Sequence, residues 1–433
     1  MSHDALLARH RKVMPSWMGL YYEHPIEIVR GSGRRVTDGE GREYLDFFGG
    51  ILTNMLGYDV PEVRAAVEEQ VASGVVHTST LYLIRHQVEL AEQIAALSGI
   101  PDAKVFFTAS GSEAIEAALL LCTQYRRSNS ILALRNSYHG RSFATMAVTG
   151  NRGWSASSLS PLNVSYAQSG YRYRSAFGHL DDGAYIDACA ADLRDVIDTT
   201  TSGDVACLIA EPIQGVGGFT VPPDGLLGAY QDVCNEHGIL YVSDEVQTGW
   251  GRTGEHFWGY QSHGVAPDLL TFAKGLGNGL TLGGVVARGE VMDCITANSL
   301  STFGGNPLST AAGVATLAYV LDHDLQANAH KVGGQILDGL RDLAGAVPTV
   351  GDVRGKGLMI GVELVQPGSK TPDTAAAARV LEATREAGLL VGKGGLYGNV
   401  LRIAPPLTVT EAEAAEGVAI LRGALQGLSE PAT

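Results

Sequence analysis

The chain has 433 residues, of which 45% are hydrophobic and 18% charged, and its formal net charge is −15. This composition is that of an ordinary globular protein with enough apolar surface for about two or three domains. The negative charge argues against a nucleic-acid or anionic-membrane partner, because both require a basic surface.

The five cysteines have no spacing typical of a metal site, so we expect free thiols, no bound metal and a reducing, cytoplasmic environment. Residues 1–22 contain no apolar core of the length of a signal peptide, and no apolar run in the chain is long enough to span a bilayer. We therefore expect no membrane partner.

The first hundred residues predict short strands followed by two helices. Ile26–Gly50 alternates apolar and polar residues around the turn sequences Gly31–Gly33 and Asp38–Gly41, which indicates antiparallel strands. Pro61–Ser73 and Gln87–Ala96 have the pattern of amphipathic helices.

From about residue 102, apolar runs alternate with helical patterns, which predicts a mostly parallel sheet with helices on both faces. Ligands bind such sheets beyond the carboxyl ends of the strands. The expected strands are Lys104–Phe107, Ile131–Leu134, Val205–Ala210, Ile239–Ser243, Leu269–Phe272 and Gly283–Ala287, and the expected helices include Glu113–Arg126 and Leu226–His237.

After about residue 325 the pattern becomes α+β. We expect a helix through Val332–Leu343, strands near Leu358–Val365 and Leu389–Val391, a surface loop at Gln366–Ala375 and a closing helix at Glu411–Leu425.

Asp244 and Lys274 carry the clearest chemistry in the sequence. Asp244 ends the apolar run Ile239–Ser243, and Lys274 follows another apolar run and precedes a glycine-rich bend. Taken singly, the aspartate could cap a helix and the lysine could be solvated. Together they supply the amine that forms an imine with pyridoxal 5′-phosphate (PLP) and the carboxylate that keeps the ring nitrogen protonated. Gln247 could then reach the phenolic oxygen. The pair predicts a PLP enzyme, and specifically an aminotransferase.

Other segments are compatible with such a site. Thr108–Ser112 places small residues before a helix, so Gly111 and Ser112 could seat a phosphate, although Ser112 could also be a helix N-cap. Tyr138 could stack on a flat ring or pack in the core. Arg402 lies in an apolar run and could form a buried salt bridge or bind a substrate carboxylate through two hydrogen bonds.

Together these segments resemble the class III (subgroup II) aminotransferases of PLP fold type I, from about residue 22 to 425. The resemblance implies an α/β fold: a large domain with a mostly parallel mixed sheet between helices, and a smaller α+β domain built from both chain ends. The corresponding division is 1–60, 61–324 and 325–433. The motifs that carry it are Gly41–Asp46, Ser110–Ala114, Tyr138–Gly140, Glu211–Gly215, Asp244–Gly249, Ala273–Gly275, Thr302–Pro307 and Arg402–Pro406.

The resemblance also implies roles for individual residues. Lys274 forms the Schiff base, Asp244 pairs with the ring nitrogen, and Arg402 takes the α-carboxylate. Thr302 reaches the phosphate of a neighbouring subunit, which implies a homodimer with shared active sites, or a tetramer built from it. The positions implied to bind the cofactor are Ser110, Gly111, Ser112, Tyr138, His139, Glu211, Asp244, Gln247, Lys274 and Thr302.

One departure from the family bears on the substrate. Ornithine and 4-aminobutyrate aminotransferases place a glutamate five residues after the position of Glu211, where it neutralises the arginine when a substrate lacks an α-carboxylate. Val216 stands there in this chain. In this respect, and in the stretch Val350–Gly361, the chain is similar to the alanine–glyoxylate aminotransferase 2 and 3-aminoisobutyrate–pyruvate aminotransferase group. We therefore expect a small 2-oxo acid acceptor such as pyruvate or glyoxylate, used in a ping-pong mechanism.

Alternatives remain at this point. Arg141 matches an arginine that grips the distal carboxylate in 4-aminobutyrate aminotransferase, so an ω-amino acid donor stays open. The main rival is an aminotransferase of the 4-aminobutyrate or ornithine type that uses 2-oxoglutarate. Decarboxylating transamination, an aminomutase and a non-catalytic PLP-binding subunit are the others.

Overall fold

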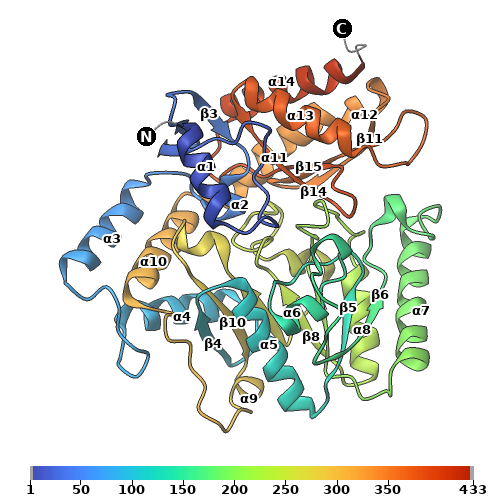
Figure 1. The fold of residues 1–433 in the computed structure, drawn as a ribbon. Coiled ribbons are helices and arrows are strands. Elements are labelled where there is room, and N and C mark those ends of the chain that lie inside the picture. Colours follow the sequence, from blue (N-terminus) through green and yellow to red (C-terminus); the bar gives the residue numbers. More distant parts are fainter. Residues whose placement is uncertain (1–2, 430–433) are drawn as a thin grey trace.

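A central sheet of seven strands organises the computed structural model, which describes residues 3–429 (Figure 1). The strand order is β4-β10-β9-β8-β7-β5-β6, and β10 runs antiparallel to both of its neighbours while the others are parallel. The bounds are β4 (Ala103–Thr108), β5 (Ser130–Leu134), β6 (Asn163–Ala167), β7 (Cys207–Ala210), β8 (Leu240–Asp244), β9 (Leu269–Phe272) and β10 (Gly283–Arg288).

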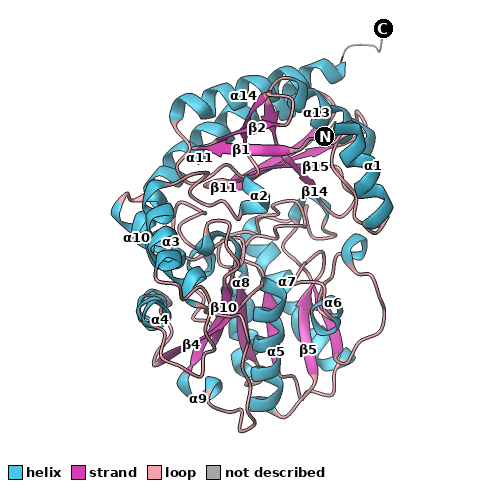
Figure 2. Cartoon of the chain, turned by 60° about the vertical axis from the view of Figure 1, so that its left-hand side comes forward, coloured by secondary structure: helices cyan, strands magenta, loops and turns pink. Residues whose placement is uncertain are grey.

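Helices cover both faces of this sheet (Figure 2). Successive side chains of a strand point to opposite faces: Ile131 and Ala133 of β5 join an apolar cluster with α5, whereas Leu132 and Leu134 join another with α7 and α8. Burial on both faces explains why these strands are continuous apolar runs. The helices of this part are α3 (Pro61–Ala72), α4 (Arg85–Leu97), α5 (Gly111–Arg126), α6 (Phe143–Ala147), α7 (Asp182–Thr200), α8 (Leu226–Glu236), α9 (Gly289–Met292) and α10 (Pro307–Asp322).

Both ends of the chain lie together in the upper part of Figure 1 and form two smaller sheets. In the first, β1 (Ile28–Ser32), β2 (Arg35–Asp38) and β3 (Glu43–Asp46) are joined by β13 (Leu389–Leu390), which runs parallel to β3. The second has the order β11-β12-β15-β14. Its strands are β11 (Val350–Lys356), β12 (Met359–Leu364), β15 (Val400–Ile403) and β14 (Gly392–Gly394).

The helices of this smaller part flank those two sheets. They are α1 (His3–Val13), α2 (Gly49–Leu52), α11 (Leu325–Arg341), α12 (Leu343–Ala346), α13 (Thr374–Glu386) and α14 (Glu411–Gln426). Short 3₁₀ turns complete the chain: η1 (Arg152–Trp154), η2 (Arg172–Arg174), η3 (Gly259–His263), η4 (Lys274–Gly277) and η5 (Gly427–Ser429). No helix in residues 3–429 combines the length and apolarity needed to cross a membrane.

The predicted fold class is confirmed, and the six predicted strands of the central sheet are present. The helix predicted at Val332–Leu343 instead begins at Leu325, because the Asp324 side chain accepts a hydrogen bond from the Ala327 amide and caps it. The predicted loop at 366–375 ends earlier, since Asp373 caps α13 in the same way. The domain boundaries at 60 and 324 stay a prediction.

Candidate active site

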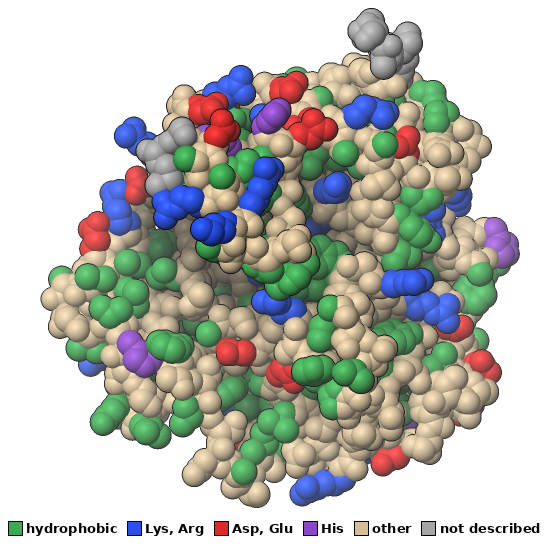
Figure 3. Space-filling model, viewed as in Figure 1, with side chains coloured by type: hydrophobic (Ala, Val, Ile, Leu, Met, Phe, Trp, Pro, Cys, Tyr) green, Lys and Arg blue, Asp and Glu red, His purple; other side chains and the backbone are tan. Residues whose placement is uncertain are grey.

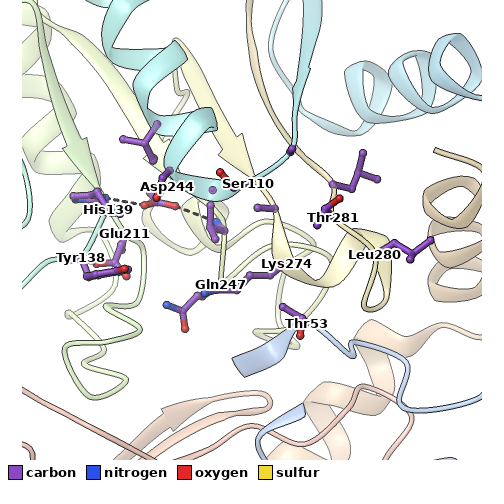
Figure 4. A pocket seen from close by; sticks show the side chains of 18 of the residues that line it. Thr53, Ser110, Tyr138, His139, Glu211, Asp244, Gln247, Lys274, Leu280 and Thr281 are labelled. Carbon is purple, nitrogen blue, oxygen red and sulfur yellow. Dashed lines mark hydrogen bonds and ion pairs between the residues drawn. The ribbon is translucent and has the colours of Figure 1, made fainter. Parts of the chain in front are cut away.

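A cavity of about 330 Å³ lies at the carboxyl ends of β7, β8 and β9, beside the start of α5. In the space-filling view the molecule is hollowed between its upper and lower parts (Figure 3). Of the predicted site residues, the cavity is lined by Ser110, Gly111, Ser112, Tyr138, His139, Glu211, Asp244, Gln247 and Lys274. Figure 4 shows Tyr138, His139 and Glu211 on one side, Thr281 and Leu280 on the other, and Lys274 between them.

Lys274 follows β9 and opens the turn η4, where its backbone has the left-handed φ of 49°. Few residues other than glycine adopt this conformation, and it is a strained one for a lysine. Burial lowers the pKa of the Lys274 amine to about 8, and the charge of Arg402 adds to that effect while Asp244 and Glu211 oppose it. The structure therefore provides a buried amine that is partly uncharged near neutral pH.

Asp244 is the last residue of β8 and is buried beside His139. Its Oδ2 lies 2.7 Å from His139 Nδ1, and its Oδ1 accepts a hydrogen bond from the Val246 amide at 3.1 Å (Figure 4). The His139 amide in turn donates to Thr149 Oγ1 at 3.1 Å. His139 thus fixes the orientation of the Asp244 carboxylate.

The first turn of α5 lines the cavity next to these groups. Ser110 is the N-cap, because its side chain accepts a hydrogen bond from the Glu113 amide at 3.2 Å. The alternative that Ser112 caps the helix is therefore wrong: Ser112 Oγ instead accepts from the Arg141 amide at 3.2 Å. The positive end of the helix dipole and the small residues Ser110–Ser112 suit an anion.

Glu211 follows β7 and joins two loops of the site. Its carboxylate accepts one hydrogen bond from the Tyr138 amide and one from the Gly215 amide, both at 2.8 Å. Burial, reinforced by the charge of Asp244, raises the pKa of Glu211 to about 7. This carboxyl group therefore holds the loop that carries Tyr138 against the loop that begins at Gly215.

Arg402 lies on β15, in a different sheet, and reaches the site through Gln247. Its Nη2 donates to Gln247 Oε1 at 2.8 Å, and its guanidinium carbon lies 5.2 Å from the centre of the Phe48 ring and 4.6 Å from that of Phe219. Burial lowers the pKa of Arg402 to about 10. Of the two readings of Arg402 in the sequence, a buried salt bridge is wrong, because among the described residues its hydrogen-bond partner is an amide.

Arg141 and Thr302 do not line the cavity. Arg141 is exposed, and its guanidinium carbon lies 5.8 Å from the ring centre of Trp17 in the N-terminal segment. Thr302 is exposed in the loop before α10.

Several residues of the site carry no signal in the sequence. Thr53, Leu280 and Thr281 line the cavity, and Phe48 packs on Arg402. Hydroxyl and apolar side chains are too common to be recognised as site residues by type or spacing. Phe48 could have been suspected only from its place beside the predicted motif ending at Asp46.

The site fits PLP by its chemistry. PLP has an aldehyde, a basic ring nitrogen and a phosphate, and the cavity offers a buried amine, a buried carboxylate and a helix N-terminus for them. Gly140 has a φ of 137°, and a Cβ there would lie 2.6 Å from Ser112 Oγ. Only glycine leaves this wall of the cavity open.

Comparison with known proteins gives the same assignment. The model of the aminotransferase class-III family matches residues 20–425. The chain is 41% identical to alanine–glyoxylate aminotransferase 2 homolog 2, mitochondrial, of Arabidopsis thaliana, over 95% of this chain and 85% of that protein. It is 35% identical to the 4-aminobutyrate aminotransferase of Escherichia coli K12, over 97% of each.

A solved structure agrees with these relatives. The amine transaminase of an uncultivated Pseudomonas species, determined in its PLP-bound form, superposes with a TM-score of 0.89 at 32% identity, over 96% of this chain and 98% of that one. With the family model covering nearly the whole sequence, the chain belongs to the class-III aminotransferases and is a PLP-dependent enzyme.

Proposed function

We propose that this aminotransferase moves an amino group from an amino acid (alanine, a β- or ω-amino acid, or a related amine) to a small 2-oxo acid such as pyruvate or glyoxylate. One observation supports a substrate that has an α-carboxylate. Arg402 is buried next to Gln247, which lines the cavity, and among the described residues its hydrogen-bond partner is the neutral amide of Gln247. An incoming α-carboxylate therefore meets a cation that forms no ion pair within residues 3–429.

The position of Val216 supports this choice. A Cβ built at Gly394 would lie 2.6 Å from Arg402 Cδ and 3.0 Å from the Val216 carbonyl oxygen, so Val216 and Arg402 flank the same glycine. Val216 is buried and apolar. By the resemblance drawn from the sequence, it stands where ornithine and 4-aminobutyrate aminotransferases carry a glutamate. The name of the Arabidopsis relative points to the same acceptor class.

Each residue of the cavity has a separate role in the proposed reaction. Lys274 is the covalent attachment point of PLP and, once a donor amine has displaced it, the base that moves a proton from the substrate α carbon. PLP, when bound, supplies an aldehyde for the amino group and a ring that withdraws electrons from the α carbon.

Asp244, held by His139, keeps a negative charge beside the ring nitrogen, and the start of α5 holds the phosphate. Arg402 orients the substrate by its carboxylate and so directs one bond of the α carbon toward Lys274. Two half-reactions of this kind make a ping-pong cycle.

A 4-aminobutyrate type of enzyme with 2-oxoglutarate as acceptor is the second candidate. Arg141 favours it, because this arginine follows Gly140, which lines the cavity, and could hold a distal carboxylate. The relative from Escherichia coli is consistent with this reading. Other class-III reactions, such as decarboxylating transamination or amino-group migration, would use the same Lys274.

We also propose a homodimer with shared active sites. Thr302 is exposed and does not line the cavity of its own chain, and the neighbouring Phe303 packs on His77 at 4.8 Å between ring centres. The segment that follows His77 exposes further apolar side chains, including Leu83 at 98% exposure. A second copy would cover this surface and take up Thr302. A cytoplasmic location is proposed from the five free thiols.

The test is a screen of acceptors on the purified enzyme, with alanine as donor for the oxo acids that permit it and an ω-amino acid for the others. We expect the highest kcat/KM with pyruvate or glyoxylate. A strong preference for 2-oxoglutarate would contradict the proposal and support the second candidate. Light scattering during chromatography measures the dimer.

A further inference from the structure

We propose that Gln247 is the resting partner of Arg402: its amide oxygen occupies the guanidinium until a substrate carboxylate displaces it, and returns when the substrate has none. The inference rests on the proposed role of Arg402 as the carboxylate site. It assigns to Gln247 control of which substrates the enzyme accepts.

The contact between the two side chains is direct and buried. Arg402 Nη2 donates to Gln247 Oε1 at 2.8 Å, and both residues are almost inaccessible to solvent. A hydrogen bond from a charged donor is stronger than one between neutral groups. Gln247 also lines the cavity, so a bound substrate and this amide compete for the same guanidinium.

The surroundings fix the geometry of this pair. The Arg402 guanidinium lies between the rings of Phe48 and Phe219, and its Nε has no partner among the described residues. A carboxylate that replaced the amide could therefore use this unpaired donor as well as Nη2. The substrate would gain one hydrogen bond more than the amide offers.

The fold also makes room for Gln247. A methyl group at Gly215 would overlap the Gln247 side-chain amide, and the Gly215 amide is held by Glu211 at 2.8 Å. The glycine is thus fixed by a buried carboxylate on one side and touches the amide on the other. A side chain at position 215 would therefore displace the Gln247 amide.

A neutral partner has two consequences. An ion pair inside a protein costs much more to break than a hydrogen bond to an amide, so an α-carboxylate binds here more easily than it would against a glutamate. A buried cation left without any partner is also costly. The amide removes this cost when the substrate is an amine without a carboxylate.

Two substitutions at this position test the proposal on the holoenzyme. In Gln247→Glu an anion of the same size holds Arg402, and we expect the Kd of propionate, an unreactive carboxylate, to rise at least about tenfold. In Gln247→Met the competitor is removed, and the Kd should fall about three- to tenfold. Isothermal titration calorimetry measures both.

The second readout is the ratio of kcat/KM for alanine to kcat/KM for a simple primary amine without a carboxylate. Gln247→Glu should lower this ratio and Gln247→Met should raise it. Both constants come from one preparation, so partial loss of folded enzyme cancels. Gln231→Met is the matched control and should leave the ratio unchanged, because this buried glutamine bonds to the Ala266 backbone and not to Arg402.

Shifts of propionate Kd or of the ratio in the same direction in both variants, or no shift in either, would overturn the role of Gln247. Failure of the underlying function looks different. If Arg402 is not the carboxylate site, Arg402→Met leaves propionate binding at the wild-type value; if it is, binding weakens at least about tenfold whatever the Gln247 variants do.

Discussion

The cofactor end and the substrate end of the cavity are built in different ways. Glu211 and Lys274 follow β7 and β9, and Asp244 ends β8; these three strands are neighbours in one sheet. At the other end, Arg402 comes from β15 in a second sheet and Phe48 from the N-terminal part of the chain. The groups proposed to perform the chemistry thus share one edge of a sheet, whereas those proposed to select the substrate meet where two sheets adjoin.

That junction is held by a buried ionic cluster. Arg354 on β11 donates to the Gly218 carbonyl at 2.8 Å and forms an ion pair with Glu363 on β12 at 2.8 Å. Gly218 belongs to the loop that starts at Gly215 and carries Val216. Substitutions at the sheet edge should therefore abolish chemistry, and those at the junction should redistribute substrates.

The largest effect is expected for Lys274→Ala at the sheet edge. Turnover should fall by at least about 10⁴-fold, because both the covalent attachment and the proton transfer are lost. The melting temperature should change little, since the lysine is a strained, buried cation that adds little to stability. Lys331→Ala, at an exposed lysine paired with Glu411, is the control and should retain full activity. Normal turnover of Lys274→Ala would show that the assignment is wrong.

Asp244→Asn should lower kcat by about 10²- to 10³-fold, because an amide cannot keep the ring nitrogen charged in the way a carboxylate does. The KM for the oxo acid should stay near its wild-type value, since Arg402 is untouched. Steady-state kinetics separate the two constants. A change in KM alone would mean that the two ends of the cavity are not independent.

The pKa of Lys274 links the two ends of the cavity, because the charge of Arg402 at the substrate end contributes to it. The pKa of Lys274 is about 8, below its ordinary value of 10.5, so the reactive neutral amine forms as the pH rises through about 8. About one tenth of it is neutral at pH 7, and an ordinary lysine would be almost fully charged there. The rate at which apoenzyme takes up PLP should therefore rise with pH, reach half its maximum near pH 8 and level off roughly one pH unit higher.

The same experiment with Arg402→Met tests the electrostatic link. The charge of Arg402 contributes to the lowered pKa of Lys274, so its removal should move the midpoint of this profile to higher pH. Stopped-flow absorbance follows the reaction. An unmoved midpoint would show that burial alone sets the pKa.

The smallest effect is expected at the exposed contact between Trp17 and Arg141. Trp17 is 73% exposed and lies against the Arg141 guanidinium, and an exposed contact of this type contributes about 0.5–1 kcal/mol. Trp17→Ala should therefore change the KM for an ω-amino acid such as 4-aminobutyrate by about two- to fivefold, and that for alanine hardly at all. Equal changes in KM for both donors would show that Arg141 does not belong to the substrate site.

The sequence by itself determined which side chains lie at the carboxyl edge of the central sheet. Continuous apolar runs predicted the strands, and an acid or amine directly after such a run must emerge at the edge of the sheet, so Asp244 and Lys274 could be found from local pattern alone. The capping residue of α5 was less certain, because Ser110 and Ser112 are equally good caps by residue type. The contact geometry selects Ser110.

Only the tertiary structure decided which residues contact one another at the substrate end of the cavity. Nothing local to Gln247 or Arg402 indicates that they meet, since they are far apart in the chain and lie in different sheets. The contact with Phe48, the parallel pairing of β13 with β3 and the placement of Trp17 over Arg141 depend on the same folding of both chain ends together. Local patterns report strands and helices, whereas contacts between distant segments arise when their apolar faces pack.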